Sequence, residues 1–270
     1  MGLSRDQIAE AASLLISAGR SGTRLSALPE RIRPEAIEDA HAVHDAVREA
    51  LRQDIGAIKV NLAGGVVFRG TLASAVCRPS PARFDAAPGQ FAGIEAEIAF
   101  RFPDGLLPSP DSYDPARVAE ATEACAAFDL VGTRFHDFMR RSQFERIADG
   151  LNAGAFAYGP FRRNWLGVNF AELAVQVSVD GIESFSGIGG HAASDPFLYA
   201  LAYAETVRDQ GIAPGTILTT GSLCGLLPVA PGQTIRARLG DFHPIEVTLR
   251  PIDNEGDALE RTRPGRREYQ

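Results

Sequence analysis

Two glutamates spaced two residues apart, Glu95 and Glu97 in the segment GIEAEIAF, have the clearest chemical potential in this sequence. In a β-strand this spacing points both side chains to one face, while Ala96 and Ile98 face the other way. Two carboxylates on a buried face repel each other and lose hydration, so protons or a cation must neutralise them. A hard divalent cation such as Mg²⁺ does this with oxygen ligands. The alternative is an amphipathic strand whose polar face is simply wet.

Two further residues could act beside this pair. Asp129 lies in AAFDLVGTRF between apolar residues, so an inward-facing carboxylate there would need a partner. With the glutamates it could supply three ligands and leave positions for substrate and water, as at a catalytic Mg²⁺ site. Lys59 is the single lysine among 27 basic residues. Because guanidinium does not replace a compact, proton-shedding ammonium, we expect Lys59 to have a functional role.

The elements that must position these residues are mostly short strands. Runs of β-forming residues bounded by Gly, Pro, Asp or Asn predict strands at IGAIKV, GIEAEIAF, AFDLVGTRF, AELAVQVSVDG, GTILTTGSL, QTIRARLG and IEVTLR. Apolar residues at helical spacing, together with Pro and Gly boundaries, predict helices over residues 4–19, 34–53, 115–127 and 196–210. The Pro-rich segments 78–90 and 103–115 are predicted to be connections.

This pattern predicts an α+β fold in three parts. Residues 1–54 form a helical region, residues 55–252 a β-rich catalytic domain, and residues 253–270 a flexible tail without apolar periodicity. The content of 45% hydrophobic and 23% charged residues is ordinary for a globular protein.

Composition also excludes several classes of partner. A net charge of −7 argues against a nucleic-acid surface, which needs a basic stripe. No run approaches the roughly 20 apolar residues that cross a bilayer. The three cysteines lack CxxC spacing, which fits a reducing cytoplasm rather than a disulfide framework. We therefore expect a cytoplasmic protein with a small-molecule ligand.

Several segments in a fixed order resemble a known family. They are IGAIKVNL, FRGTL, GIEAEIAF, AFDLVGTRFHDF, ADGLNAGAFAYG, GIGGHAASDP and TILTTGSLCGLLPVAPGQTI. The chain resembles the fumarylacetoacetate hydrolase superfamily, and more closely its branch of 2-oxopent-4-enoate hydratases and oxalocrotonate decarboxylases of aromatic catabolism. The resemblance extends to about residue 250 and implies a mixed β-sandwich or roll and a homo-oligomer.

The resemblance also implies roles for individual residues. Glu95, Glu97 and Asp129 correspond to the ligands of Mg²⁺ or Mn²⁺, although the family usually has Glu at the third position. Lys59 corresponds to the family lysine, which moves protons. The substrate carboxylate would be bound by Thr220, Gly221 and Ser222, with a further substrate contact from His191.

One departure from the family lies in FRGTL, where hydratases usually carry an acidic residue and this chain has Phe68 and Arg69. Arg69 could instead clamp a second substrate carboxylate, since guanidinium pairs with carboxylate through two hydrogen bonds. It could equally reach solvent.

The resemblance implies a metal-dependent lyase that adds water to a 2-hydroxy-2,4-dienoate or 2-oxo-4-enoate. Three alternatives stay open: a 2-oxo-3-enedioate decarboxylase, an acylpyruvate-type C–C hydrolase, and a protein that binds a 2-oxo acid without turning it over. A metal that stabilises an enolate would serve all three reactions, so the metal site alone does not choose among them.

Overall fold

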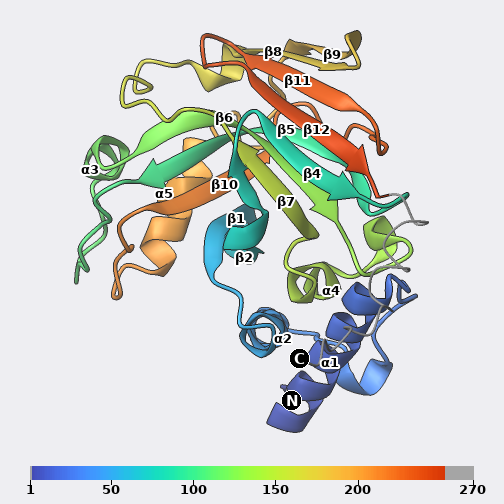
Figure 1. The fold of residues 1–270 in the computed structure, drawn as a ribbon. Coiled ribbons are helices and arrows are strands. Elements are labelled where there is room, and N and C mark those ends of the chain that lie inside the picture. Colours follow the sequence, from blue (N-terminus) through green and yellow to red (C-terminus); the bar gives the residue numbers. More distant parts are fainter. Residues whose placement is uncertain (1, 253–270) are drawn as a thin grey trace, which may run out of the picture.

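Two β-sheets share one apolar core in the computed structural model, which describes residues 2–252 (Figure 1). The larger sheet has the strand order β2 (Val66–Ala73), β1 (Ile55–Ala63), β10 (Thr216–Ser222), β5 (Phe91–Phe102), β6 (Glu123–Gly132), β7 (Ala153–Tyr158) and β3 (Cys77–Pro79). The smaller sheet has the order β4 (Ala82–Ala86), β12 (Ile245–Pro251), β11 (Thr234–Leu239), β8 (Ala174–Val179) and β9 (Ile182–Ile188). The β1–β10, β3–β7 and β4–β12 pairs are parallel, and the other pairs are antiparallel.

Residues that alternate along the strands build the core. In β11, Ile235 and Ala237 are buried while the intervening Arg236 is exposed, as the period of two in a strand requires. The ring of Phe100 on β5 meets Trp165 edge-on, with the ring centroids 5.0 Å apart. Burial of these apolar surfaces, at roughly 25 cal/mol per Å², is the main force that holds the two sheets together.

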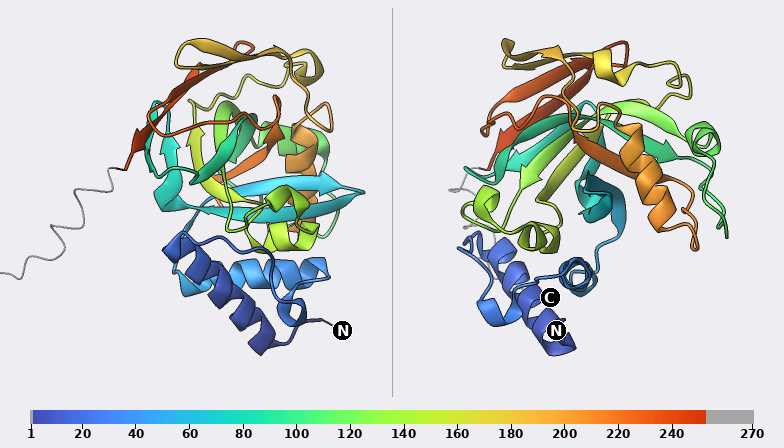
Figure 2. Two further views of the ribbon diagram at one scale, coloured as in Figure 1. Left: turned by 90° about the vertical axis from the view of Figure 1, so that its right-hand side faces the viewer. Right: turned by 180° about the vertical axis from the view of Figure 1, so that it is seen from behind.

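Within residues 2–252, five α-helices surround the sheets: α1 (Arg5–Ser21), α2 (Ile37–Ala50), α3 (Pro115–Glu120), α4 (Gln143–Ala148) and α5 (Phe197–Thr206). The same part of the chain has four short 3-10 helices: η1 (Glu30–Ile32), η2 (Ser74–Val76), η3 (Phe138–Arg140) and η4 (Phe170–Glu172). A capping box between Ser4 and Gln7 starts α1, and Gly22, with φ 70°, ends it. Figure 2 shows α1 and α2 together on one side of the molecule, where α2 packs on β2 and α4.

The α+β fold class and the helical N-terminus are confirmed, and all seven predicted strand segments contain strands. The prediction of a helix over 115–127 is wrong in its second half: α3 ends at Glu120 and β6 begins at Glu123. Alanines favour a helix, but here they fill the buried face of a strand between β5 and β7.

Other boundaries also differ. Segment 78–90 contains part of β3 and the whole of β4, and α5 ends at Thr206 instead of continuing to Gln210. The predicted tail, 253–270, lies outside the described residues, and the division into domains stays a prediction. No helix within residues 2–252 has the length and apolar character needed to span a bilayer.

Candidate active site

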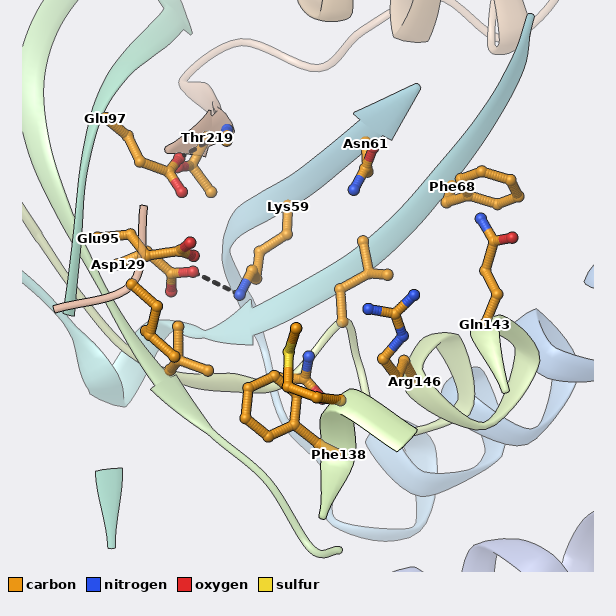
Figure 3. Close-up of a pocket in the computed structure, with 16 residues that line it drawn as sticks. Lys59, Asn61, Phe68, Glu95, Glu97, Asp129, Phe138, Gln143, Arg146 and Thr219 are labelled. Carbon is orange, nitrogen blue, oxygen red and sulfur yellow. Dashed lines mark hydrogen bonds and ion pairs between the residues drawn. The ribbon is translucent and has the colours of Figure 1, made fainter. Parts of the chain in front are cut away.

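Four neighbouring strands bring the candidate residues together (Figure 3). Lys59 on β1 lies opposite Thr219 on β10, and Glu95 on β5 lies opposite Asp129 on β6. Glu97 follows on the same face of β5, as the spacing predicts. The order β1-β10-β5-β6 therefore sets residues from distant parts of the sequence side by side.

The three carboxylates form a compact cluster. One oxygen from each of Glu95, Glu97 and Asp129 lies within 4.8 Å of the others. Asp129 is fully buried and Glu97 is 2% exposed. Burial, followed by the charge of Asp129, raises the pKa of Glu95 to about 7. Burial and the two neighbouring acids raise the pKa of Glu97 to about 8. Negative charge on this cluster therefore needs a counterion.

Lys59 supplies part of that counterion. Its Nζ lies 2.5 Å from Oδ2 of Asp129. Burial opposes the charge of the ammonium, but Asp129 and Glu95 outweigh burial and raise the pKa of Lys59 above its usual value. Three carboxylates and one ammonium leave two negative charges, which is the charge that one divalent cation neutralises.

The hydrogen bonds of the cluster also suit a cation. Oδ1 of Asp129 is buried and has no hydrogen-bond partner among residues 2–252. Oε2 of Glu97 accepts hydrogen bonds from the hydroxyl of Thr219 and from the N–H groups of Thr220 and Gly221, at 3.1 and 3.0 Å. The other oxygen of Glu97 remains available as a ligand. An unsatisfied buried carboxylate is costly unless a metal completes it, so this donor set fits Mg²⁺ or Mn²⁺.

A bulge in β10 orients the N–H groups of Thr220 and Gly221 toward Glu97. The register with β5 shifts between Thr219 and Ser222, and Gly221 has φ 101°, which only glycine adopts without strain. His191 braces the bulge: its Nδ1 accepts the N–H of Ala193 at 3.2 Å, so its Nε2–H donates to the carbonyl of Thr220 at 2.7 Å. Burial lowers the pKa of His191, which keeps the ring neutral.

The predicted substrate-binding residues are only partly in the cavity. Gly221 lines it, together with Thr219, which the sequence reasoning missed. The hydroxyl of Thr220 is buried and donates to the carbonyl of Ile98 at 2.8 Å, and the hydroxyl of Ser222 donates to the carbonyl of Gly225. Thr220, Ser222 and His191 are not among the residues that line the cavity, and their polar groups are used within the protein.

The structure does not bring Arg69 into the cavity. On β2 it faces the side opposite Phe68, which does line the cavity. The guanidinium of Arg69 donates two hydrogen bonds to the carboxylate of Asp45 on α2, at 3.0 and 2.6 Å. The expected role of Arg69 as a clamp for a substrate carboxylate is therefore corrected to a link between α2 and the sheet.

The cavity beside the cluster has a volume of about 360 Å³. Its other wall comes from η3, α4 and the turn that follows, through Phe138, Met139, Gln143, Arg146, Leu151 and Asn152. This turn lies against β2 so closely that a Cβ on Gly70 would come within 2.2 Å of the carbonyl oxygen of Gly150. Glycine at position 70 therefore permits the contact that closes the cavity.

Sequence reasoning missed most of this second wall. Asn61 could have been found, because it lies two residues after Lys59 in a predicted strand and so shares its face. Arg146 lies in the unpredicted helix α4, and no strand pattern leads to it.

No family model matches the sequence. The chain is 29% identical over 142 residues to 2-hydroxyhexa-2,4-dienoate hydratase of Comamonas testosteroni, a match to 52% of this chain and 53% of that relative. It thus spans about half the length of that relative. It is 25% identical over 247 residues to TodF product hydratase of Pseudomonas putida, covering 86% of this chain and 91% of the relative.

A solved structure has a similar fold. The 4-oxalocrotonate decarboxylase from Pseudomonas putida G7, complexed with magnesium and adipate, gives a TM-score of 0.76 at 20% identity and matches 93% of this chain and 99% of that one. The chain is thus similar in sequence to two hydratases and to a 4-oxalocrotonate decarboxylase, and it has the fold of a 4-oxalocrotonate decarboxylase of known structure.

Proposed function

We propose that this chain is a metal-dependent lyase that adds water to a 2-hydroxy-2,4-dienoate or its 2-oxo tautomer. One observation carries the proposal: three buried carboxylates and the single lysine of the chain face one cavity of a size suited to a small organic acid. Two relatives named as hydratases support it. A cytoplasmic location, expected from the spacing of the cysteines, and a homo-oligomer, implied by the family resemblance, belong to the same proposal.

The proposed metal ligands are Glu95, Glu97 and Asp129, with Mg²⁺ or Mn²⁺ as the cation. When bound, the cation would draw electron density from the 2-oxo acid and so make its C3 protons more acidic. The hydrogen bonds that hold Oε2 of Glu97 would keep this side chain in one orientation. Such support of a ligand is worth roughly 10- to 100-fold in metal affinity.

The reaction needs two proton movements beside the cation. First, the dienol loses its O2 proton and gains one at C5, which yields a 2-oxo-3-enoate. Then the oxygen of water bonds to C4 while a proton adds at C3. Among the described cavity-lining residues, Lys59 and Arg146 are the ionisable groups that are not proposed metal ligands, and arginine does not deprotonate. We assign the proton transfers to Lys59.

Decarboxylation of a 2-oxo-3-enedioate is the second candidate. It is favoured by Phe68, which lines the cavity in the segment where hydratases carry an acid. In this reaction the bond from the distal carboxylate to its carbon breaks, CO₂ leaves, and the carbon chain takes up a proton. Apolar surroundings favour the conversion of a carboxylate to neutral CO₂. An acylpyruvate C–C hydrolase and a non-catalytic binding protein remain as alternatives.

Two assays test the proposal in the presence of Mg²⁺. Hydration of 2-hydroxypenta-2,4-dienoate is measured as the loss of the dienol absorbance, and decarboxylation of 2-oxohex-3-enedioate is measured as the release of CO₂. Glu97→Gln should reduce Mg²⁺ affinity and turnover by roughly 100-fold, since it removes a charged ligand but keeps the side-chain shape. Glu183→Gln, on the exposed face of β9, should change neither.

Unchanged Mg²⁺ affinity of Glu97→Gln in calorimetry would refute the metal assignment. Tight Mg²⁺ binding without turnover of either substrate would favour the non-catalytic binding protein.

A further inference from the structure

Arg146 is the second cationic residue of the cavity, and the reaction proposed above does not use it. It projects from α4 on the side opposite the three carboxylates, with Lys59 between them in Figure 3. A capping box between Ser142 and Glu145 fixes α4, and Glu145 and Ile147 are buried on its other side. The helix therefore holds Arg146 toward the cavity.

The guanidinium of Arg146 has no ion-pair or hydrogen-bond partner among residues 2–252, and its Nε is buried. Six residues in this part of the chain have a buried polar side-chain atom without a partner, and three of them, Asp129, Arg146 and Asn152, line this cavity. Unsatisfied buried groups are costly: Oδ1 of Asp129 and Oδ1 of Asn152 lack a donor or a cation, whereas the guanidinium of Arg146 lacks an acceptor, which an anionic group in the cavity would supply.

The surroundings of Arg146 suit an anionic group at the end of a short carbon chain. Phe68 and Leu151 give this wall apolar surface, and the amides of Asn61 and Gln143 provide N–H donors. The acidic residues that line the cavity are the three carboxylates at the other end. An anion beside Arg146 would therefore meet donors, and arginine binds carboxylates through two parallel hydrogen bonds.

We propose that Arg146 binds a second carboxylate at the far end of the substrate, so that the enzyme prefers 2-oxo dicarboxylic acids over monocarboxylic ones. The inference rests on the proposed function, because the first carboxylate and the 2-oxo group must lie at the metal end. In hydration the tail of the substrate does not react, whereas in decarboxylation the carboxylate beside Arg146 would be the group that leaves as CO₂.

Two unreactive six-carbon acids test this in calorimetry with saturating Mg²⁺. 2-Oxohexanedioate and 2-oxohexanoate differ only in a terminal carboxylate or methyl group. The wild-type protein should bind the diacid at least about tenfold more tightly. Arg146→Gln should remove this preference while the affinities for Mg²⁺ and for the monoacid stay the same. Arg140→Gln, which removes the same charge from an exposed position outside the cavity, should keep the preference.

Each contrary result has a separate meaning. Equal binding of both acids by the wild-type protein would overturn the role of Arg146 and leave the proposed function in place. Equal weakening of both acids by Arg146→Gln would also overturn it, since Arg146 would then bind the first carboxylate. Failure of the wild-type protein to bind either acid with Mg²⁺ would overturn the proposed function and this inference together.

Discussion

At the scale of single residues, the site is defined by an imbalance of charge. Glu95, Glu97 and Asp129 share one small region, and Lys59 offsets one of their charges. Without a cation, the protein relieves the remaining repulsion by taking up protons, which is why the pKa values of Glu95 and Glu97 are raised. Protons and the proposed divalent cation would therefore compete for the same oxygens.

This competition predicts that Mg²⁺ affinity rises with pH between about 6 and 8. Below the pKa values of about 7 and 8 for Glu95 and Glu97, the cation must displace protons, and above them it binds free carboxylates. Calorimetry at pH 6.5 in buffers of different ionisation enthalpy should record proton release on Mg²⁺ binding, and release should vanish near pH 9. Binding that is independent of pH would contradict this account.

The residues of the site could be predicted from the sequence to different degrees. The shared face of Glu95 and Glu97 follows from the period of a strand, which is a property of the backbone. Asp129 was predicted because its neighbours are apolar and because of the family resemblance. Arg146 could not be predicted, because its position depends on how α4 packs over β2, and that packing has no local signature in the sequence.

At the scale of elements, the bulge in β10 links backbone geometry to the proposed metal site. A regular strand would continue the ladder with β5, whereas the shift after Thr219 turns the N–H groups of Thr220 and Gly221 toward Glu97. Sequence patterns located β10 and the Thr-Gly-Ser segment. They did not reveal that Thr219, rather than Ser222, faces the cavity, because a bulge changes which side each residue faces.

Gly221→Ala should weaken Mg²⁺ binding by roughly 10- to 100-fold, because alanine is strained at φ 101° and the bulge would change shape. Gly215→Ala is the matched control: Gly215 has φ 81°, and a Cβ there meets nothing within 4 Å. Both variants should lose about 1 kcal/mol of stability, measured by urea unfolding. Equal Mg²⁺ affinity in the two variants would exclude the bulge as a support of the site.

At the scale of the whole molecule, α2 joins the N-terminal helices to the edge of the larger sheet. β2 is the edge strand, and two of its outward N–H groups meet histidines on α2. The N–H of Arg69 donates to Nε2 of His41 at 3.2 Å, and the N–H of Thr71 donates to Nε2 of His44 at 3.0 Å. The edge is thus covered, which prevents pairing with another chain there. The helical spacing of apolar residues predicts α2, but it does not reveal what the polar face of this helix contacts.

This contact predicts a loss of stability in mild acid. Burial lowers the pKa of His44 to about 4, whereas the unfolded chain keeps a value near 6.5. As the pH falls from 6.5 to 4, the unfolded chain takes up the proton before the folded protein does. The contribution of His44 to the free energy of unfolding is therefore complete above pH 6.5 and falls by up to about 3 kcal/mol through this range. His44→Gln, which keeps an acceptor but does not titrate, should flatten that part of the curve in urea unfolding at pH 7.5 and 5. His243→Gln, at an exposed site, should leave the curve as in the wild type. An unaltered slope in His44→Gln would rule out this origin.

The two walls of the cavity differ in how they are built. The end with the proposed metal ligands rests on four paired strands inside the sheet. The other end consists of one continuous segment, residues 138–152, which closes in a turn with Leu151 and Asn152 both at positive φ. Replacing this single stretch of chain exchanges the surface that meets the substrate's tail and leaves every proposed metal ligand in place. The architecture therefore separates the choice of molecule from the chemistry performed on it, so that new specificities can be grafted onto an unchanged reaction centre.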